Sequence, residues 1–146
     1  MANLYTQRVY DNSLLLKAAA LVGSTADGTL ILDLGNGLID ADLILDVTAI
    51  ETDTGDESYA VILEGSPDAT FGTATNIAVL SRIVIGHHSA TAMAPQGFDS
   101  TVGRYCVCVR NELNGTTYRY ARIRTVVAGT VATGINYMAW LSKDDD

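Results

Sequence analysis

The chain has 146 residues, a formal net charge of −8, 48% hydrophobic residues and 18% charged residues. This length and balance are typical of one globular domain and exclude an intrinsically disordered chain, while the excess of acids argues against a general nucleic-acid binder. Thirteen glycines and only two prolines, in a sequence rich in Val and Thr, favour strands and turns over helices.

The beginning of the chain gives the weakest structural signal. Residues 1–12 show no clear hydrophobic period, and we expect them to form an N-terminal arm. Residues 13–22 could form a short helix, with Ser13 as its cap and Gly23 as its terminator.

The apolar run that starts at Leu14 does not indicate targeting. Lys17 interrupts it, and Asp11 spoils the basic region that a signal peptide needs upstream. The run is also far too short to span a bilayer. We therefore expect a soluble, unprocessed protein with no membrane partner.

The next segments are predicted to be strands. Residues 29–34 form a first strand, closed by a glycine-rich turn. Residues 42–51 alternate between apolar and polar side chains, which indicates a half-buried strand, and residues 58–64 follow as its return strand. These two strands would make a hairpin with an acidic tip that carries Asp53, Asp56 and Glu57.

Residues 102–127 are predicted to form one long β-hairpin around Asn114-Gly115, the dipeptide that best fits a tight hairpin turn. A two-residue loop pairs Val109 with Tyr120, Val107 with Arg122, and Tyr105 with Arg124. One face then carries the residues that we predict as a protein interface. These are Tyr105, Tyr118, Tyr120, Arg122 and Arg124.

Strict alternation places Cys106, Cys108, Ala121 and Ile123 on the other face of this hairpin, which we expect to be core. A disulfide between the cysteines is disfavoured by their spacing, so we expect buried thiols. The register also places two like charges, Arg110 and Arg119, opposite each other. A bulge would relieve that repulsion but would slip the pairing. The simpler alternative is a solvated sheet without an interface.

In total, seven or eight strands alternate with turns, and a last strand covers residues 135–141. We therefore predict an all-β fold, an antiparallel β-sandwich or jelly roll of about eight strands, with residues 13–146 as a single jelly-roll domain after the arm.

The charges are segregated along the chain. Residues 18–81 contain eleven acids and no Lys or Arg, whereas five of the nine bases are arginines between positions 104 and 124. Two alternatives follow. The acidic part could pair with the basic part of a neighbouring molecule, or the two could neutralise each other within one fold.

No short catalytic or nucleotide-binding motif occurs, and we expect no catalytic, cofactor-binding or metal-binding residues and no enzyme activity. Cys106 and Cys108 with His87 and His88 do not have zinc-site spacing, and adjacent histidines on a strand would point apart. The acidic tip around Gly55 lacks the spacing of a calcium loop.

Three stretches together resemble the tailed-bacteriophage capsid decoration proteins, also called cement proteins. The closing hairpin and the final strand also suit that family. The stretches are Tyr10-Asp11 with Leu14-Leu15-Leu16, then Ile31-Leu32-Asp33-Leu34-Gly35, and Ser58 to Ser66 continuing through Asp68 to Phe71-Gly72.

The resemblance implies a jelly-roll protein on the outer surface of the virion capsid, often a homotrimer at three-fold positions. Such a protein stabilises the shell by bridging subunits of the major capsid protein. The alternative is a carbohydrate-binding β-sandwich, with Trp140, Tyr105, Tyr118 and Tyr120 available to stack on sugar rings. Trp140, however, lies in an apolar alternation that favours a core position.

Overall fold

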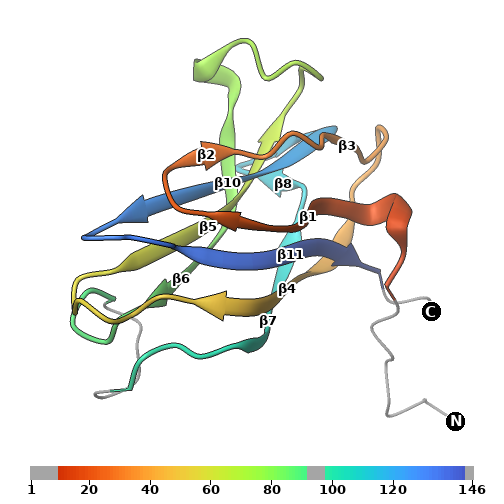
Figure 1. Cartoon of the computed structure of the whole chain (residues 1–146). Helices are drawn as coiled ribbons and strands as arrows, with labels where there is room; N and C mark the ends of the chain where they lie inside the picture. The colour runs from red at the N-terminus through yellow and green to blue at the C-terminus, as the bar shows by residue number, and fades with distance from the viewer. Residues whose placement is uncertain (1–9, 92–97, 144–146) are drawn as a thin grey trace, which may run out of the picture.

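The computed structural model describes residues 10–91 and 98–143, and these form two antiparallel β-sheets packed face to face (Figure 1). In spatial order, the first sheet contains β1 (Leu15–Val22), β11 (Ile135–Ser142), β4 (Asp40–Ile50) and β7 (Gly103–Arg110). The second contains β10 (Tyr120–Ala128), β5 (Ser58–Ser66) and β6 (Ala78–Gly86), and two short strands, β2 (Ala26–Asp27) and β3 (Leu32–Asp33), both pair with the outer edge of β10.

The connectivity is that of a jelly roll. If the β2–β3 edge is counted as one strand, consecutive strands of the two sheets lie in opposite sheets, except for β5 and β6, which are neighbours in the second sheet. The predicted all-β sandwich is confirmed. The described residues form eleven strands instead of about eight, because β2 and β3 divide one edge and a small hairpin adds β8 (Glu112–Leu113) and β9 (Thr116–Thr117).

The helical content of the described residues is limited to two 3-10 turns, η1 (Asn12–Leu14) and η2 (Ala74–Asn76). Within residues 10–91 and 98–143, no helix has the length and apolarity needed to cross a bilayer. Most of the predicted N-terminal arm, residues 1–9, lies outside the described residues.

The core lies between the two sheets and is built from alternate residues of each long strand. Leu43, Leu45 and Val47 of β4 face Ala121 and Ile123 of β10 across it, and all are at most 4% exposed. Full burial of one large aliphatic side chain stabilises the folded state by roughly 1.5–3 kcal/mol. The predicted core positions on β10 and the predicted alternation of residues 43–47 are therefore confirmed, whereas a register shift after Val47 leaves Ala49 exposed and packs Ile50 against the core.

The predicted helix over residues 13–22 is wrong, because most of this segment is strand β1. It pairs with β11 along the edge of the first sheet, and its Leu16 is fully buried. The register shifts on both sides of Lys17, whose ammonium donates to the carbonyls of Ala18, Ala20 and Tyr137 at 2.9–3.1 Å. Tertiary pairing thus overrides the helix propensity of the alanine run.

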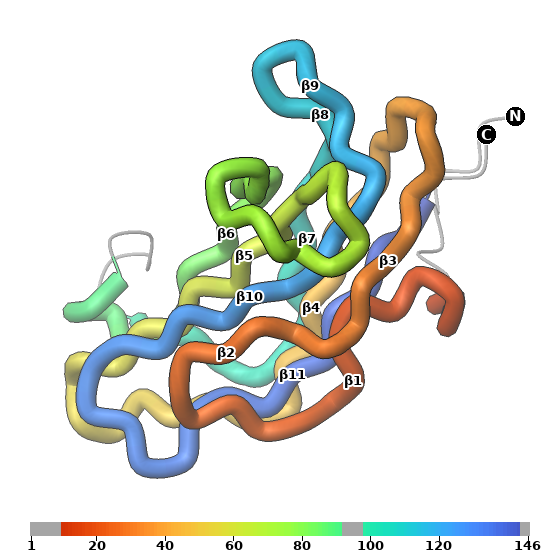
Figure 2. Tube along the Cα trace, turned by 90° about the horizontal axis from the view of Figure 1, so that it is seen from above, coloured from red at the N-terminus to blue at the C-terminus, as the bar shows by residue number. Residues whose placement is uncertain are grey.

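Both predicted long hairpins are also wrong. β4 and β5 lie in different sheets, and so do β7 and β10. The Asn114-Gly115 turn does form, and the predicted register holds at its tip, where Glu112 faces Thr117. Figure 2 shows this small β8–β9 hairpin projecting beyond the sheets. A turn signal fixes the tip of a hairpin but not how far the pairing continues.

The predicted faces of β7 are reversed. Tyr105, Val107 and Val109 are directed toward the core, whereas Cys106 and Cys108 are exposed. The prediction of buried thiols is therefore wrong. The physical reason is that β7 pairs with β4 and not with β10, so the apolar set that best covers the core decides which face is buried.

Candidate functional site

The five predicted interface residues do not share one face. Tyr105 lies on β7 in the first sheet, and its hydroxyl donates to the carbonyl of Thr101 at 2.7 Å. Tyr120, Arg122 and Arg124 alternate along β10 in the second sheet, on the side away from the core. Tyr118 precedes β10. The two sheets therefore separate Tyr105 from the other predicted residues.

Arg122 is part of a half-buried cluster and is not an exposed contact. Its side chain is 14% exposed, and its Nε donates to the carboxylate of Glu64 at 2.7 Å. The guanidinium lies 4.4 Å from the ring centre of Phe71, which is itself 6% exposed. Removing one partner of such a buried pair leaves an uncompensated charge, so Arg122 holds the fold together.

The arginines between positions 104 and 124 all pair with carboxylates of the acidic part of the same chain. This outcome confirms the alternative in which the two charged parts neutralise each other within one fold. The pairs are Arg104 with Asp46, Arg110 with Asp40, Arg119 with Asp33, Arg122 with Glu64 and Asp27, and Arg124 with Asp27.

Arg110 and Arg119 are therefore not opposed to each other, as the predicted hairpin would have required. The hydrogen bond from Arg119 and one from the backbone of Gly35 lower the pKa of Asp33 to about 2. On the outer face of β10, Tyr120 is half-buried and the side chain of Arg124 is 40% exposed.

Trp140 is fully buried, as its apolar alternation predicts, although it lies on the outer side of the first sheet. Its indole N–H donates to Asp46 at 3.2 Å, and the ring of Tyr10 packs edge-on against it with centroids 5.5 Å apart. The guanidinium of Arg104 lies 5.4 Å from the ring centre. A ring enclosed in this way presents no face on which a sugar could stack.

The acidic turn between β4 and β5 does not offer its oxygens to a cation. The buried carboxylate of Glu57 accepts the backbone N–H groups of Thr54, Gly55 and Asp56 at 2.6–3.1 Å. Burial opposes ionisation, but the hydrogen bonds from Thr54 and its neighbours outweigh it and lower the pKa of Glu57. Both oxygens of the Glu57 carboxylate are therefore used to hold the backbone of the turn that contains it.

Glu51 and Asp56 extend the same arrangement to the loop between β10 and β11. Glu51 accepts the backbone N–H groups of residues 132–134 at 2.6–3.1 Å, and these bonds lower its pKa to about 2. Asp56 accepts the N–H of Thr130 at 2.8 Å, which also lowers its pKa. The two loops are thus joined through carboxylates and backbone donors.

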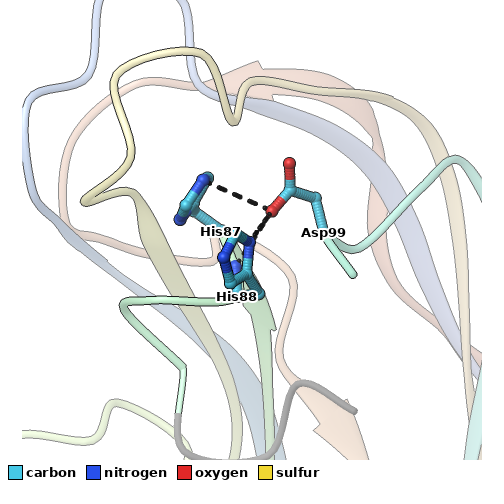
Figure 3. A group of neighbouring side chains, drawn as sticks. All are labelled: His87, His88 and Asp99. Carbon is cyan, nitrogen blue, oxygen red and sulfur yellow. Dashed lines mark hydrogen bonds and ion pairs between the residues drawn. The ribbon is translucent and has the colours of Figure 1, made fainter. Parts of the chain in front are cut away.

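A third cluster of polar side chains lies at the same end of the sandwich, in the segment that follows β6. The rings of His87 and His88 are stacked with centroids 4.2 Å apart, and both face one oxygen of Asp99 (Figure 3). Oδ1 of Asp99 lies 2.8 Å from Nδ1 of His88 and 3.5 Å from Nε2 of His87. We refer to these three residues as the His-Asp cluster.

Sequence reasoning missed this cluster for two reasons. The expectation that adjacent histidines point apart holds on a strand, but β6 ends at Gly86 and the histidines lie in the turn that follows. Asp99 is eleven positions from His88 and carries no motif. It is placed by Ser100, which exchanges hydrogen bonds with Gly86 at 2.9 and 3.0 Å.

Comparison with known proteins adds no relative, since no protein-family model and no curated protein sequence matches the chain.

Proposed function

We propose that this chain is a structural virion protein that binds the outer surface of a phage capsid. It stabilises the shell by bridging neighbouring subunits of the major capsid protein. The proposal starts from the resemblance to capsid decoration proteins. It is supported by the jelly-roll connectivity of the two sheets, since the resemblance implies a jelly roll.

One observation carries the proposal furthest. Glu64 and Phe71 both belong to the stretch that resembles decoration proteins, and they meet in space on either side of Arg122. The stretch therefore holds Arg122 in place on the outer face of the second sheet. That same face presents Tyr120 and Arg124, two residue types that are enriched at protein interfaces.

We further propose that the protein acts as a homotrimer at three-fold positions of the shell. A cyclic trimer joins two different surfaces of neighbouring copies and closes on itself. Charge segregation no longer supports this assembly, because the arginines are neutralised within the chain. The support for the trimer is the resemblance alone, and light scattering on the purified protein tests it through a mass three times that of the chain.

Co-sedimentation with phage heads that lack the protein tests the capsid role. The wild-type chain should bind these heads in a saturable way and should raise the temperature at which they release DNA. The informative variant is Arg124→Glu, because the side chain of Arg124 is exposed. Among the described residues, Arg124 forms an ion pair only with Asp27. The variant should weaken binding at least tenfold while the fold persists.

Arg110→Glu is the matched control for this experiment. Arg110 is also an exposed arginine with one recorded carboxylate partner, Asp40, but it lies on the opposite sheet. Its reversal should leave capsid binding unchanged. Heads that neither bind the wild-type chain nor gain heat resistance from it would refute the capsid role. Equal binding losses in the two variants would refute the contact face on β10.

A further inference from the structure

The His-Asp cluster brings together three side chains whose atoms can bind a metal ion. The candidate ligand atoms of His87, His88 and Asp99 all lie within 4.8 Å of one another. We propose that the cluster binds a divalent transition-metal ion of the Zn²⁺ class through Nε2 of His87, Nδ1 of His88 and Oδ1 of Asp99. This inference is independent of the proposed capsid role.

The spacing of the ligand atoms suits such an ion. Zinc binds imidazole nitrogens and carboxylate oxygens at about 2.0–2.2 Å with tetrahedral angles, so its ligand atoms lie about 3.3 Å apart. The two separations from Oδ1 of Asp99, 2.8 Å to His88 and 3.5 Å to His87, lie on either side of that value. All three ligand atoms lie within 4.8 Å of one another, so small side-chain movements would complete the geometry when an ion enters.

The chemistry of the ligands selects the class of metal. Two imidazoles and one carboxylate suit zinc, copper or nickel, whereas calcium requires six to eight oxygens. The side chains of His88 and Asp99 are each 38% exposed, so the fourth position is open to water. The backbone N–H of His88 also donates to Oδ1 of Asp99 at 3.0 Å, which favours the ionised carboxylate that a metal requires.

The protons of the two rings have to be accounted for. Each neutral imidazole gives its lone pair to the metal and keeps its hydrogen on the other nitrogen. For His88 that nitrogen is Nε2. The 2.8 Å hydrogen bond between Nδ1 of His88 and Oδ1 of Asp99 is then replaced by the bonds of both atoms to the metal. For His87 the nitrogen that keeps its hydrogen is Nδ1, which accepts the N–H of Ser89 at 3.1 Å, so that contact must open as well. It lies in an exposed turn where water can replace it, and we expect an affinity below that of a closed structural zinc site.

The surrounding backbone holds the cluster in place without the metal. His87 donates its backbone N–H to the carbonyl of Glu57 at 2.9 Å, and Gly86 pairs with Ser100 beside it. Gly86 has φ of +147°, and a Cβ there would lie 2.3 Å from the same Glu57 carbonyl, so only glycine fits. A bound ion would join the two ends of the segment that connects β6 to β7.

Calorimetric titration of the full chain, without a histidine tag, with zinc chloride tests the proposal. The background should carry Cys106→Ser and Cys108→Ser, because both thiols are exposed and would also bind zinc. We expect one ion per chain and a rise in melting temperature that a chelator reverses. His88→Ala and Asp99→Asn should each weaken binding by more than about 100-fold, beyond the loss typical of an outer-shell partner.

Asp53→Asn is the matched control, since it removes one exposed carboxylate from the same end of the sandwich. It should change the affinity by less than about twofold, as expected for a residue outside the site. A folded parent protein that binds no zinc would overturn the proposal, as would full binding by both cluster variants. If a variant fails to fold, X-ray absorption of the zinc-loaded parent decides, because the site requires two imidazole ligands.

Discussion

The loops at the two ends of the sandwich have their backbone groups bonded by different kinds of side chain. Both ends must satisfy backbone groups in loops that lack ladder partners. At one end, which we call the carboxylate end, Glu51, Asp56 and Glu57 accept the N–H groups of residues 54–56, of Thr130 and of residues 132–134. At the opposite end, which we call the amide end, the buried neutral side chain of Asn111 has this role, beside the less buried carboxylates of Asp33, Asp68 and Glu112.

Asn111 is 3% exposed and uses both ends of its amide. Its oxygen accepts the N–H of Ile39 at 2.7 Å, and its nitrogen donates to the carbonyls of Gly37 and Tyr118 at 3.0 and 3.1 Å. These bonds join the loop before β4 to the base of the β8–β9 hairpin. The buried side-chain bonds of Asn111 at the amide end therefore do not depend on ionisation, whereas those of Glu51, Asp56 and Glu57 at the carboxylate end do.

The largest effect is expected from Asn111→Asp, which puts a charge where the fold uses an amide. At neutral pH the carboxylate cannot donate to the carbonyls of Gly37 and Tyr118 and instead repels them. The free energy of unfolding should fall by about 3 kcal/mol or more. Urea denaturation, followed by the fluorescence of Trp140, measures this loss.

The pH dependence of the same variant identifies the cause. Burial beside two carbonyls raises the folded pKa of the new carboxyl above its unfolded value, so part of the lost stability should return as pH falls and the group protonates. Asn111→Ala removes the amide without adding a charge. Relative to the parent, its loss should be the same at pH 7 and at pH 4. If the stability loss of Asn111→Asp were the same at both pH values, the loss could not be assigned to a buried charge.

Glu51→Gln is the converse exchange at the carboxylate end. The pKa of Glu51 is lowered to about 2, so its contribution is complete above its unfolded pKa and is lost as pH falls toward 2. The variant should lower the melting temperature by about 5 °C at pH 7 and by less at pH 3. Calorimetry at both values tests this, and an equal loss at both would refute the role of ionisation.

A smaller, local effect should appear in the wild-type protein as pH falls toward 2, where Glu51 becomes protonated. Protonation of Glu51 and its neighbours weakens the bonds to Thr130 and to residues 132–134, whereas the amide of Asn111 is unchanged. Hydrogen exchange, corrected for its intrinsic pH dependence, should show protection falling first at the carboxylate end. Simultaneous loss in residues 37–39 would mean that the ends open together.

The smallest effect is expected from Arg110→Ala. This arginine and its partner Asp40 are 52% and 64% exposed, although they form two close contacts of 2.6 and 3.0 Å. Exposed ion pairs contribute little, so the melting temperature should change by about 1 °C or less. A large loss would mean that the ion pair, and not Asn111, holds the amide end.

The sequence predicts the fold class because turn spacing and strand alternation are local signals. It does not predict the partner of each strand. In a jelly roll, strands adjacent in sequence cross between sheets, and a crossover turn such as residues 51–57 resembles a hairpin turn in composition. The reversed face of β7 follows from this error, because a strand assigned to the wrong partner is also assigned the wrong side.

The candidate sites were predicted less well for a similar reason. The outward alternation of Tyr120, Arg122 and Arg124 along one strand was predictable. The carboxylates that neutralise the arginines were not, because Glu64 and Asp27 come from strands whose positions depend on the tertiary fold. Asp99 reaches the histidines through the pairing of Ser100 with Gly86, and no local pattern encodes that contact.

The bulges of β1 limit how many chains can join by strand pairing. An edge strand with a regular ladder is a template for further strands and hence for fibres. In β1 the ladder is irregular around Lys17, whose ammonium already occupies the carbonyls of Ala18 and Ala20. Copies concentrated side by side, as they would be on a shell, would therefore resist open-ended polymerisation through this edge.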